Sequence, residues 1–172
     1  MIHPLVGHED ARASLIAAHG AGTLPAALRI VGPRGVGKQR LALWLGQRIL
    51  CEASVSSEPC GECRHCRRVL KLEHPDLHWY FPLPRPKGAS GDKLGDALED
   101  ARRGRLAELR DEPLYPSHRG EATAIYLAAA RTLRRSAQNR AAEGRGQVFI
   151  IGDAEAMVPQ ASSPEAANAL LK

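Results

Sequence analysis

The sequence Leu28-Arg29-Ile30-Val31-Gly32-Pro33-Arg34-Gly35-Val36-Gly37-Lys38-Gln39 decides the fold of this chain. A short apolar run leads into a glycine-rich loop of the form G-x-x-x-x-G-K, and apolar residues at helical spacing follow directly. Strand, glycine loop and helix form the opening unit of an α/β protein. We therefore expect a buried strand at 28–31, a helix at 38–50, and a parallel sheet flanked by helices.

The glycine-rich loop has the residue types of a phosphate-binding P-loop. Glycines allow successive backbone N–H groups to point at phosphate oxygens, and the following helix adds the partial positive charge of its N-terminus. The lysine then places an ammonium group on the outer phosphates. The predicted nucleotide-binding residues of the loop are Gly32, Pro33, Arg34, Gly35, Val36, Gly37, Lys38 and Gln39.

Two departures weaken the prediction of an ATPase. Gln39 occupies the position where a Ser or Thr hydroxyl normally binds Mg²⁺, and its longer amide is a poor replacement. Asp153 follows an apolar strand pattern and is the predicted second metal-binding residue, but Ala154 follows it instead of a Glu. Glu155 is one step further along, where we expect it to be solvated. We therefore expect weak nucleotide binding or none, and no efficient hydrolysis.

Four cysteines form the second motif, with the spacing C-x8-C-x2-C-x2-C: Cys51, Cys60, Cys63 and Cys66. Four thiolates complete the tetrahedral shell of a structural zinc ion and leave no coordination position open for catalysis. An iron–sulfur cluster, a redox pair and unpaired buried thiols remain as alternatives. His65 and His74 lie nearby in the sequence, and we expect them to be surface residues.

The remainder of the chain alternates helical and strand patterns around one unusual stretch. Residues 82–120 are rich in Pro, Gly and mixed charge, which indicates an insertion. Further elements are expected as helices at 8–22, 94–110, 121–142 and 164–172, and as strands at 76–81 and 147–153.

Length and charge exclude some classes of protein. The 172 residues fit one domain with a smaller inserted module, and no apolar run is long enough to span a bilayer. No signal peptide pattern is present at the N-terminus, so a cytoplasmic location is expected. The net charge of +5 fits contact with a polyanion or an acidic partner, and equally a solvated surface. Arg131, Arg134 and Arg135 raise the same two alternatives within one predicted helix.

A P-loop, one helix and then this cysteine spacing resemble the bacterial DNA polymerase III clamp-loader subunits, gamma/tau and delta-prime. Val6-Gly7-His8, His74-Pro75-Asp76 and Asn168-Ala169-Leu170-Leu171-Lys172 are similar to further segments of that family. The stretch 82–120 has no counterpart in the compact family pattern. Gln39 and Asp153-Ala154 resemble the delta-prime type, whereas gamma/tau motors keep a Thr or Ser and an Asp-Glu pair.

The resemblance implies that residues 1–172 are the N-terminal part of an AAA+ P-loop domain, ending before the lid and collar domains. It also implies a subunit of the DNA polymerase holoenzyme that helps load the sliding clamp onto primed DNA. The implied partners are gamma/tau and delta subunits in a hetero-pentamer, the sliding clamp and primer-template DNA, with no membrane. The alternatives are an active gamma/tau-like ATPase and a zinc-containing nucleic-acid-binding protein with a vestigial P-loop.

Overall fold

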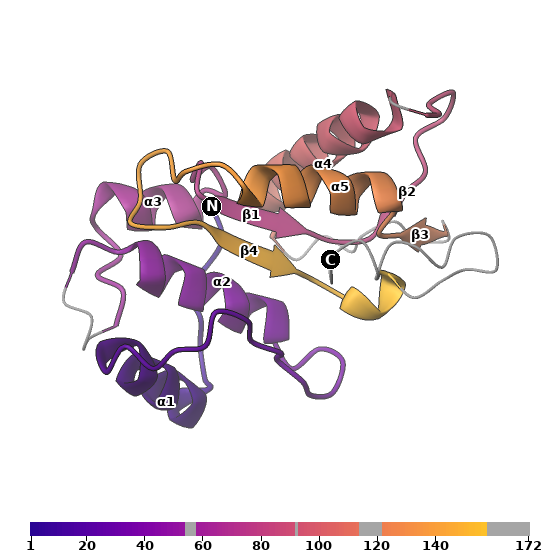
Figure 1. Cartoon of the computed structure of the whole chain (residues 1–172). Helices are drawn as coiled ribbons and strands as arrows, with labels where there is room; N and C mark the ends of the chain where they lie inside the picture. The colour runs from indigo at the N-terminus through magenta and orange to yellow at the C-terminus, as the bar shows by residue number, and fades with distance from the viewer. Residues whose placement is uncertain (54–57, 92, 114–121, 158–172) are drawn as a thin grey trace. The chain divides into compact units, whose positions relative to one another are not determined.

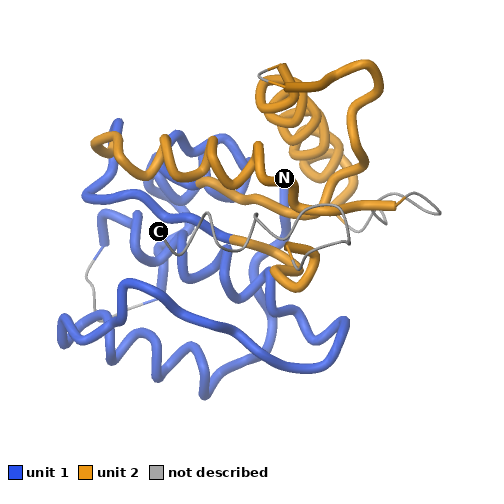
Figure 2. The backbone as a smooth tube through the Cα atoms, turned by 45° about the vertical axis from the view of Figure 1, so that its right-hand side comes forward, with its two compact units in different colours: residues 1–77, 142–150 blue, residues 78–141, 151–172 orange. Residues whose placement is uncertain are grey.

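The computed structural model describes residues 1–53, 58–91, 93–113 and 122–157. The chain folds into two compact units, coloured separately in Figure 2. Unit 1 comprises residues 1–77 and 142–150, and unit 2 comprises residues 78–141 and 151–172. The described elements confirm a mixed α/β protein (Figure 1).

The described residues of unit 1 form the helices α1 (Glu9–Gly20), α2 (Lys38–Leu50) and α3 (Arg64–Leu70). The core of this unit contains Leu41, Trp44 and Leu45, which project from α2. Apolar residues of α1 and of the segment before the P-loop pack against this cluster. Burial of this apolar stripe is what holds α2 in place, because a helix of this length has little stability by itself.

A parallel two-stranded sheet is formed by β1 (Leu77–Tyr80) and β4 (Val148–Ile151), side by side in Figure 1. The N–H of Val148 donates to the carbonyl oxygen of Asp76 at 2.8 Å. The N–H of Gly152 donates to the carbonyl oxygen of Tyr80, also at 2.8 Å. The donors and acceptors advance in the same direction along both strands, which defines the parallel pairing.

Unit 2 contains β2 (Leu83–Pro84), α4 (Lys93–Asp111), β3 (Thr123–Ala124), α5 (Leu127–Ala137) and the 3-10 turn η1 (Ala154–Met157). Strands β2 and β3 pair antiparallel, with Leu83 opposite Ala124. Helices α4 and α5 pack together, and the buried residues of the unit include Leu98, Ile125 and Leu133.

The expected strand at 28–31 is wrong, because these residues have no strand assignment. Leu28 and Val31 are 46% and 70% exposed, whereas Ile30 packs against the α2 cluster. Contact of one side chain with a helix therefore positions this segment. A strand needs hydrogen bonds to a neighbouring strand, which an apolar pattern cannot supply by itself.

The other expected elements agree with the structure to different degrees. The helices at 8–22, 38–50 and 94–110 and the strands at 76–81 and 147–153 are confirmed, with small shifts of their ends. The helix expected at 121–142 is shorter, since α5 covers only Leu127–Ala137 and β3 precedes it. The helix expected at 164–172 lies outside the described residues. Within the described part of the chain, no helix combines the length and apolar character needed to cross a bilayer.

Candidate nucleotide and metal sites

The P-loop connects the segment at 28–31 to the first turn of α2. Gly35 and Gly37 have φ angles of +79° and +90°, in the left-handed region that favours glycine. Gly37 is the N-cap of α2, no side chain caps this end, and the first turn carries no acidic residue. The partial positive charge of this helix end is therefore not offset by a capping side chain or an acidic residue, which favours an anion there.

The lysine of the motif contacts its own loop in this structure. Its Nζ donates to the carbonyl oxygens of Gly32 and Pro33, at 2.9 and 2.8 Å. His8 also contacts the loop, with its Nε2 2.7 Å from the carbonyl oxygen of Val36. These hydrogen bonds stabilise the curled backbone of the loop. The loop therefore adopts the P-loop turn while Lys38 donates to the loop's own carbonyl oxygens.

The predicted metal-binding Asp153 follows β4 and belongs to unit 2, whereas the P-loop belongs to unit 1. Asp153 has a φ of +48°, at a sharp turn into η1. Glu155 is exposed, which confirms its expected solvation. The residue between them, Ala154, has no group that could polarise a water molecule.

The four cysteines come together in unit 1 at the end of α2 and the start of α3. All four Sγ atoms lie within 4.8 Å of one another, with 3.6 Å between Cys51 and Cys60 and 3.9 Å between Cys60 and Cys66. A zinc tetrahedron with Zn–S bonds of about 2.3 Å has sulfur–sulfur edges of about 3.8 Å. The donor set therefore fits a single tetrahedral ion such as zinc.

The backbone around the cysteines also suits thiolate ligands. The N–H of Cys63 donates to the Sγ of Cys60, and the N–H of Cys66 donates to the Sγ of Cys63, each at 3.4 Å. Backbone N–H groups of Cys63 and Glu62 lower the pKa of the Cys60 thiol to about 6, whereas burial raises the pKa of Cys66. The turn passes through Gly61 at a φ of +75°.

The same distances bear on the alternatives for the cysteines. A disulfide requires sulfur atoms about 2.05 Å apart, and all four cysteines are free thiols. Thiolates of a multi-iron cluster bind different iron atoms, whereas these four surround one point within 4.8 Å of one another. A single four-coordinate ion remains the simplest occupant.

The comparison with protein families matches residues 7–172 to the family described as DNA polymerase III, delta subunit. This match covers nearly all of the chain. The chain belongs to the DNA polymerase III delta subunit family. A P-loop followed by a cysteine cluster is thus found here in a member of a replication family.

Several relatives carry names from the same polymerase. The DNA polymerase III subunit delta' of Yersinia pestis is 30% identical over 125 residues, covering 73% of this chain and 33% of the relative. That of Bacillus subtilis is 41% identical over 59 residues, covering 34% of this chain and 16% of the relative. The tau subunit of Escherichia coli is 33% identical over 73 residues, covering 42% and 11%. The chain thus matches a third or less of the length of these relatives.

A buried polar cluster that the sequence pattern did not predict lies beside the cysteines. His65 and His74 are each only 4% exposed, so the expectation that they are surface residues is wrong. His65 Nδ1 lies 2.7 Å from His74 Nε2, and burial together with His65 lowers the pKa of His74. Asp76 is fully buried beside them. The His-Pro-Asp segment was a signal for this cluster, but its partners could not be read from the sequence.

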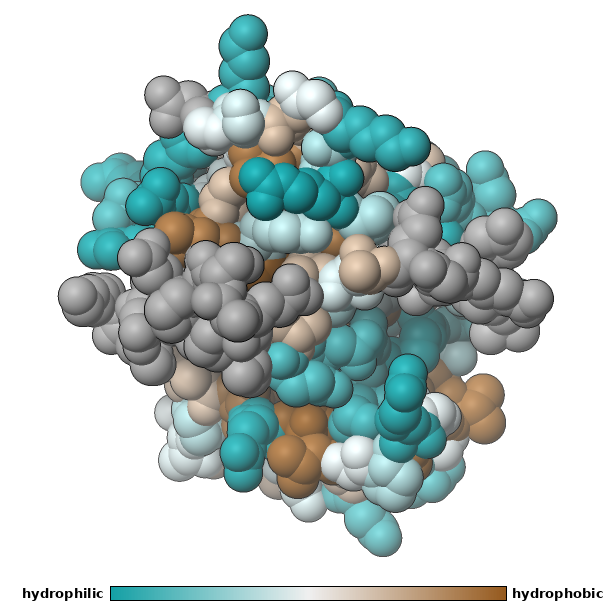
Figure 3. Space-filling view, turned by 90° about the vertical axis from the view of Figure 1, so that its right-hand side faces the viewer, coloured by the Kyte–Doolittle hydropathy of each residue, from teal (hydrophilic) through white to brown (hydrophobic). Residues whose placement is uncertain are grey.

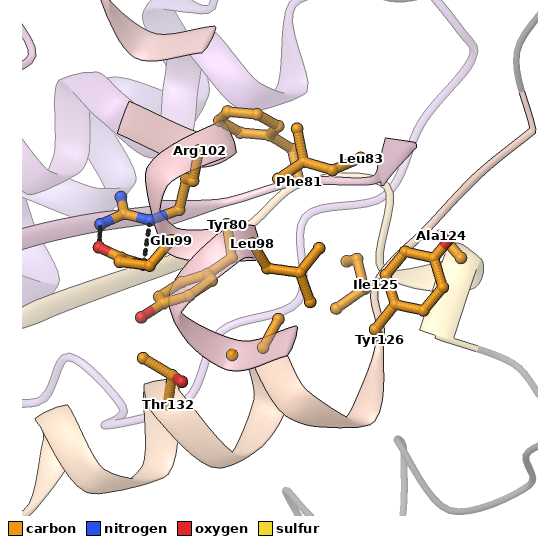
Figure 4. Close-up of a pocket in the computed structure, with 12 residues that line it drawn as sticks. Tyr80, Phe81, Leu83, Leu98, Glu99, Arg102, Ala124, Ile125, Tyr126 and Thr132 are labelled. Atoms are coloured by element: carbon orange, nitrogen blue, oxygen red, sulfur yellow. Dashed lines mark hydrogen bonds and ion pairs between the residues drawn. The ribbon is translucent and has the colours of Figure 1, made fainter. Parts of the chain in front are cut away.

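Unit 2 has its own cavity, drawn in Figure 4, between α4, α5 and the segments around β2 and β3. Arg102 pairs with Glu99 there, and its guanidinium lies 4.9 Å from the centre of the Tyr80 ring. The cavity volume is about 10 Å³, which is room for about one water molecule. This cavity therefore cannot hold a nucleotide.

The exposed side chains supply two further observations. On the face drawn in Figure 3, hydrophobic side chains lie in small patches separated by hydrophilic ones. Arg131, Arg134 and Arg135 are all exposed on α5, at the i, i+3 and i+4 spacing that places them on one face of the helix. Helix α5 contains no acidic residue that could pair with them.

Proposed function

We propose that this chain is the N-terminal AAA+ module of a delta-prime-like clamp-loader subunit. The loader would open the sliding clamp and place it on primed DNA during replication, and this subunit would contribute to its assembly. The family match over residues 7–172, together with Gln39 and Ala154, carries the proposal. The relatives named delta' support the same member of the family.

The P-loop in this proposal is an architectural element that binds nucleotide weakly or not at all. Its glycines and Lys38 are the groups that would meet the phosphates of ATP. The hydroxyl ligand for Mg²⁺ is replaced by Gln39, and no Glu follows Asp153 to orient water. Hydrolysis would therefore belong to neighbouring subunits.

We further propose that Cys51, Cys60, Cys63 and Cys66 hold a structural zinc ion. Zinc supplies a crosslink between the end of α2 and the start of α3 when it is bound. Four thiolate ligands complete its shell, so no position remains for substrate or water. The close sulfur–sulfur distances support this assignment.

The partners proposed for the full-length protein are the gamma/tau and delta subunits, the clamp and primer-template DNA. The row of exposed arginines on α5 supports contact with the DNA backbone, because guanidinium groups pair with phosphates. Residues 82–120, which the compact family pattern lacks, are proposed to be an insertion.

Reconstitution of clamp loading tests the proposal most directly. The full-length protein is mixed with tau, delta and the clamp, and loading onto primed DNA is measured for the wild type and for Lys38→Ala. If the P-loop is architectural, the loading rate of Lys38→Ala stays within about twofold of the wild type. The same lysine substitution in tau is the matched control and should abolish loading.

Two other results would replace the proposal. Micromolar binding and turnover of Mg²⁺-ATP by the protein alone, abolished in Lys38→Ala, would identify an active ATPase. Failure to join tau and delta, combined with salt-dependent DNA binding in their absence, would identify a zinc-containing nucleic-acid-binding protein.

A further inference from the structure

The loop Ala142–Gly144, which precedes β4 by three residues, is hydrogen-bonded to one buried carboxylate in unit 1. The Asp76 oxygens accept the N–H groups of Ala142, Glu143 and Gly144 at 2.6, 2.9 and 2.6 Å. Gly144 packs so closely that a Cβ at this position would lie 3.1 Å from Asp76 Oδ2 and 2.9 Å from Leu50 Cδ2. The conformation of this loop therefore depends on the position of Asp76.

A chain of buried hydrogen bonds connects Asp76 to the cysteine cluster. The N–H of Asp76 donates to His74 Nδ1 at 3.0 Å, so neutral His74 carries its proton on Nε2. His74 Nε2 can then donate to His65 Nδ1 at 2.7 Å, which leaves the proton of His65 on Nε2. That nitrogen lies 3.1 Å from Glu52 Oε1 and 3.3 Å from Arg64 Nε, which themselves form an ion pair. The hydrogen bond from the Asp76 N–H to His74 fixes the direction of the buried part of this chain, from His74 to His65.

His65 lies between two of the cysteines, at the start of α3. Cys63 is the N-cap of this helix, and its Sγ accepts the N–H of Cys66. Helix α3 has only seven residues, too few to be stable in isolation. A metal ion bound to both cysteines would fix this turn and therefore the orientation of the His65 ring.

A second connection runs along the surface. Arg68 Nη1 lies 2.6 Å from each carboxylate oxygen of Glu143. The two side chains are 40% and 31% exposed, so water screens the pair and its contribution is small. The buried route through the two histidines is expected to dominate.

We propose that metal binding by the four cysteines controls the order of the loop Ala142–Gly144 through the hydrogen-bond chain His65–His74–Asp76. The inference rests on the metal site proposed above, and it adds that metal binding there orders a loop more than seventy residues further along the sequence. Without the metal, the His65 ring is no longer oriented, and its hydrogen bond to His74 is lost. His74 then no longer fixes the position of Asp76, and the hydrogen bonds from the three loop N–H groups to the Asp76 carboxylate weaken.

Amide hydrogen exchange on the full-length protein tests this chain of contacts, because the three amides are themselves the donors to Asp76. Zinc removal should speed their exchange by at least about tenfold. Zinc-loaded His65→Leu should show the same increase, although one zinc per chain is still bound. His65→Asn is the matched control, because its side-chain oxygen can replace Nδ1 as acceptor, and its exchange should stay within about threefold of the wild type.

The zinc-loaded variants decide the question even if zinc removal unfolds the whole of unit 1. Wild-type exchange at Ala142, Glu143 and Gly144 in zinc-loaded His65→Leu would overturn the inference while leaving the metal site intact. A wild-type protein that binds no zinc would overturn the metal site and this inference with it. Arg68→Gln should change exchange by less than about threefold, and a larger effect would assign the connection to the surface pair instead.

Discussion

Three backbone N–H groups converge on the single carboxylate of Asp76, which is fully buried. Burial alone would raise the pKa of this group. The hydrogen bonds from Ala142, Gly144 and Glu143 outweigh burial, so its pKa lies below the ordinary value of 3.8. The ionised carboxylate is therefore part of the folded structure.

Replacement of Asp76 by Asn should destabilise unit 1. An amide keeps one acceptor oxygen but places its NH₂ group against backbone donors, which leaves a buried donor unsatisfied. We expect a loss of about 2–3 kcal/mol in the free energy of unfolding, measured by urea titration. Asp100→Asn is the control, because that side chain is 77% exposed, and its effect should stay within about 0.5 kcal/mol. Equal effects of the two changes would contradict this role of Asp76.

The lowered pKa of Asp76 predicts a dependence of stability on pH. A group with a depressed folded-state pKa contributes fully above its unfolded-state value, and this contribution is lost as the pH falls through the folded-state value. The difference in unfolding free energy between the wild type and Asp76→Asn should therefore be constant above about pH 5 and shrink below about pH 4. A difference that stays constant down to pH 2 would contradict this titration.

Arg48 is a fully buried cation. Its Nη2 donates to the carbonyl of Ala53 at 3.3 Å, whereas Nε and Nη1 have no partner within the described residues. Arg48→Met should keep or raise the melting temperature, because it removes an uncompensated buried charge. Arg12→Met is the control and should lower it, since Arg12 pairs with Glu58 at 2.8 Å. A large decrease in Arg48→Met would show that this charge is compensated.

At the scale of elements, two helical glycines should respond to substitution with opposite signs. A Cβ at Gly46 on α2 would lie 2.7 Å from Leu77 Cδ1 and 3.3 Å from Val148 Cγ1, whereas one at Gly104 on α4 would meet nothing within 4 Å. Gly46→Val should cost about 1–3 kcal/mol through overpacking. Gly104→Ala should stabilise by about 0.5–1 kcal/mol through helix propensity. Urea unfolding monitored by circular dichroism checks both, and a stabilising Gly46→Val would contradict the close packing of α2.

Helix α5 makes a prediction about DNA. Under the function proposed above, substitution of Arg131, Arg134 and Arg135 by Gln should weaken binding of primed DNA by the assembled loader and lower the salt slope by about 0.9 for each phosphate that is no longer neutralised. Fluorescence anisotropy at several salt concentrations measures this slope. Arg103→Gln on α4 is the control, because Arg103 lies 3.5 Å from Asp100. An unchanged slope would identify the α5 arginines as a solvated face.

Sequence patterns predicted helices, whose hydrogen bonds are local, more accurately than strands, whose hydrogen bonds come from another segment of the chain. The helix α4 follows from local periodicity and charge, and it lies within one or two residues of its expected ends. The segment 28–31 has an equally clear apolar pattern, yet it forms no strand. Helical hydrogen bonds are local, whereas those of a strand come from another segment, which an apolar pattern does not specify.

At the scale of the whole molecule, the two tryptophans report on different units. Trp44 lies in unit 1 and donates through Nε1 to Glu58 in the cysteine loop at 2.8 Å, whereas Trp79 lies in unit 2. Zinc chelation should lower the melting temperature followed by Trp44 in a Trp79→Phe variant, by about 4–8 °C for each kcal/mol of stability that unit 1 loses. The transition followed by Trp79 in a Trp44→Phe variant should move much less. Equal shifts would show that the two units unfold together.

The two candidate sites differ in how far the sequence predicted them. The cysteine spacing predicted a four-thiolate cluster, and the structure brings all four Sγ atoms within 4.8 Å. The P-loop also has its expected turn, but Lys38 contacts loop carbonyls. Close sequence spacing confines both sets of residues to a small volume. Asp153 is distant in the sequence, and its role stays a prediction.

The sequence by itself determined the glycine turn before α2, the cysteine cluster, and the absence of the hydroxyl and Glu expected of an ATPase, because residue type and short spacing specify these features. Only the tertiary structure decided that His65, His74 and Asp76 are buried together and hold the loop Ala142–Gly144. Their contacts join residues more than sixty positions apart. Such contacts form when α3 and the segment before β1 pack in one unit, and no local pattern encodes that packing.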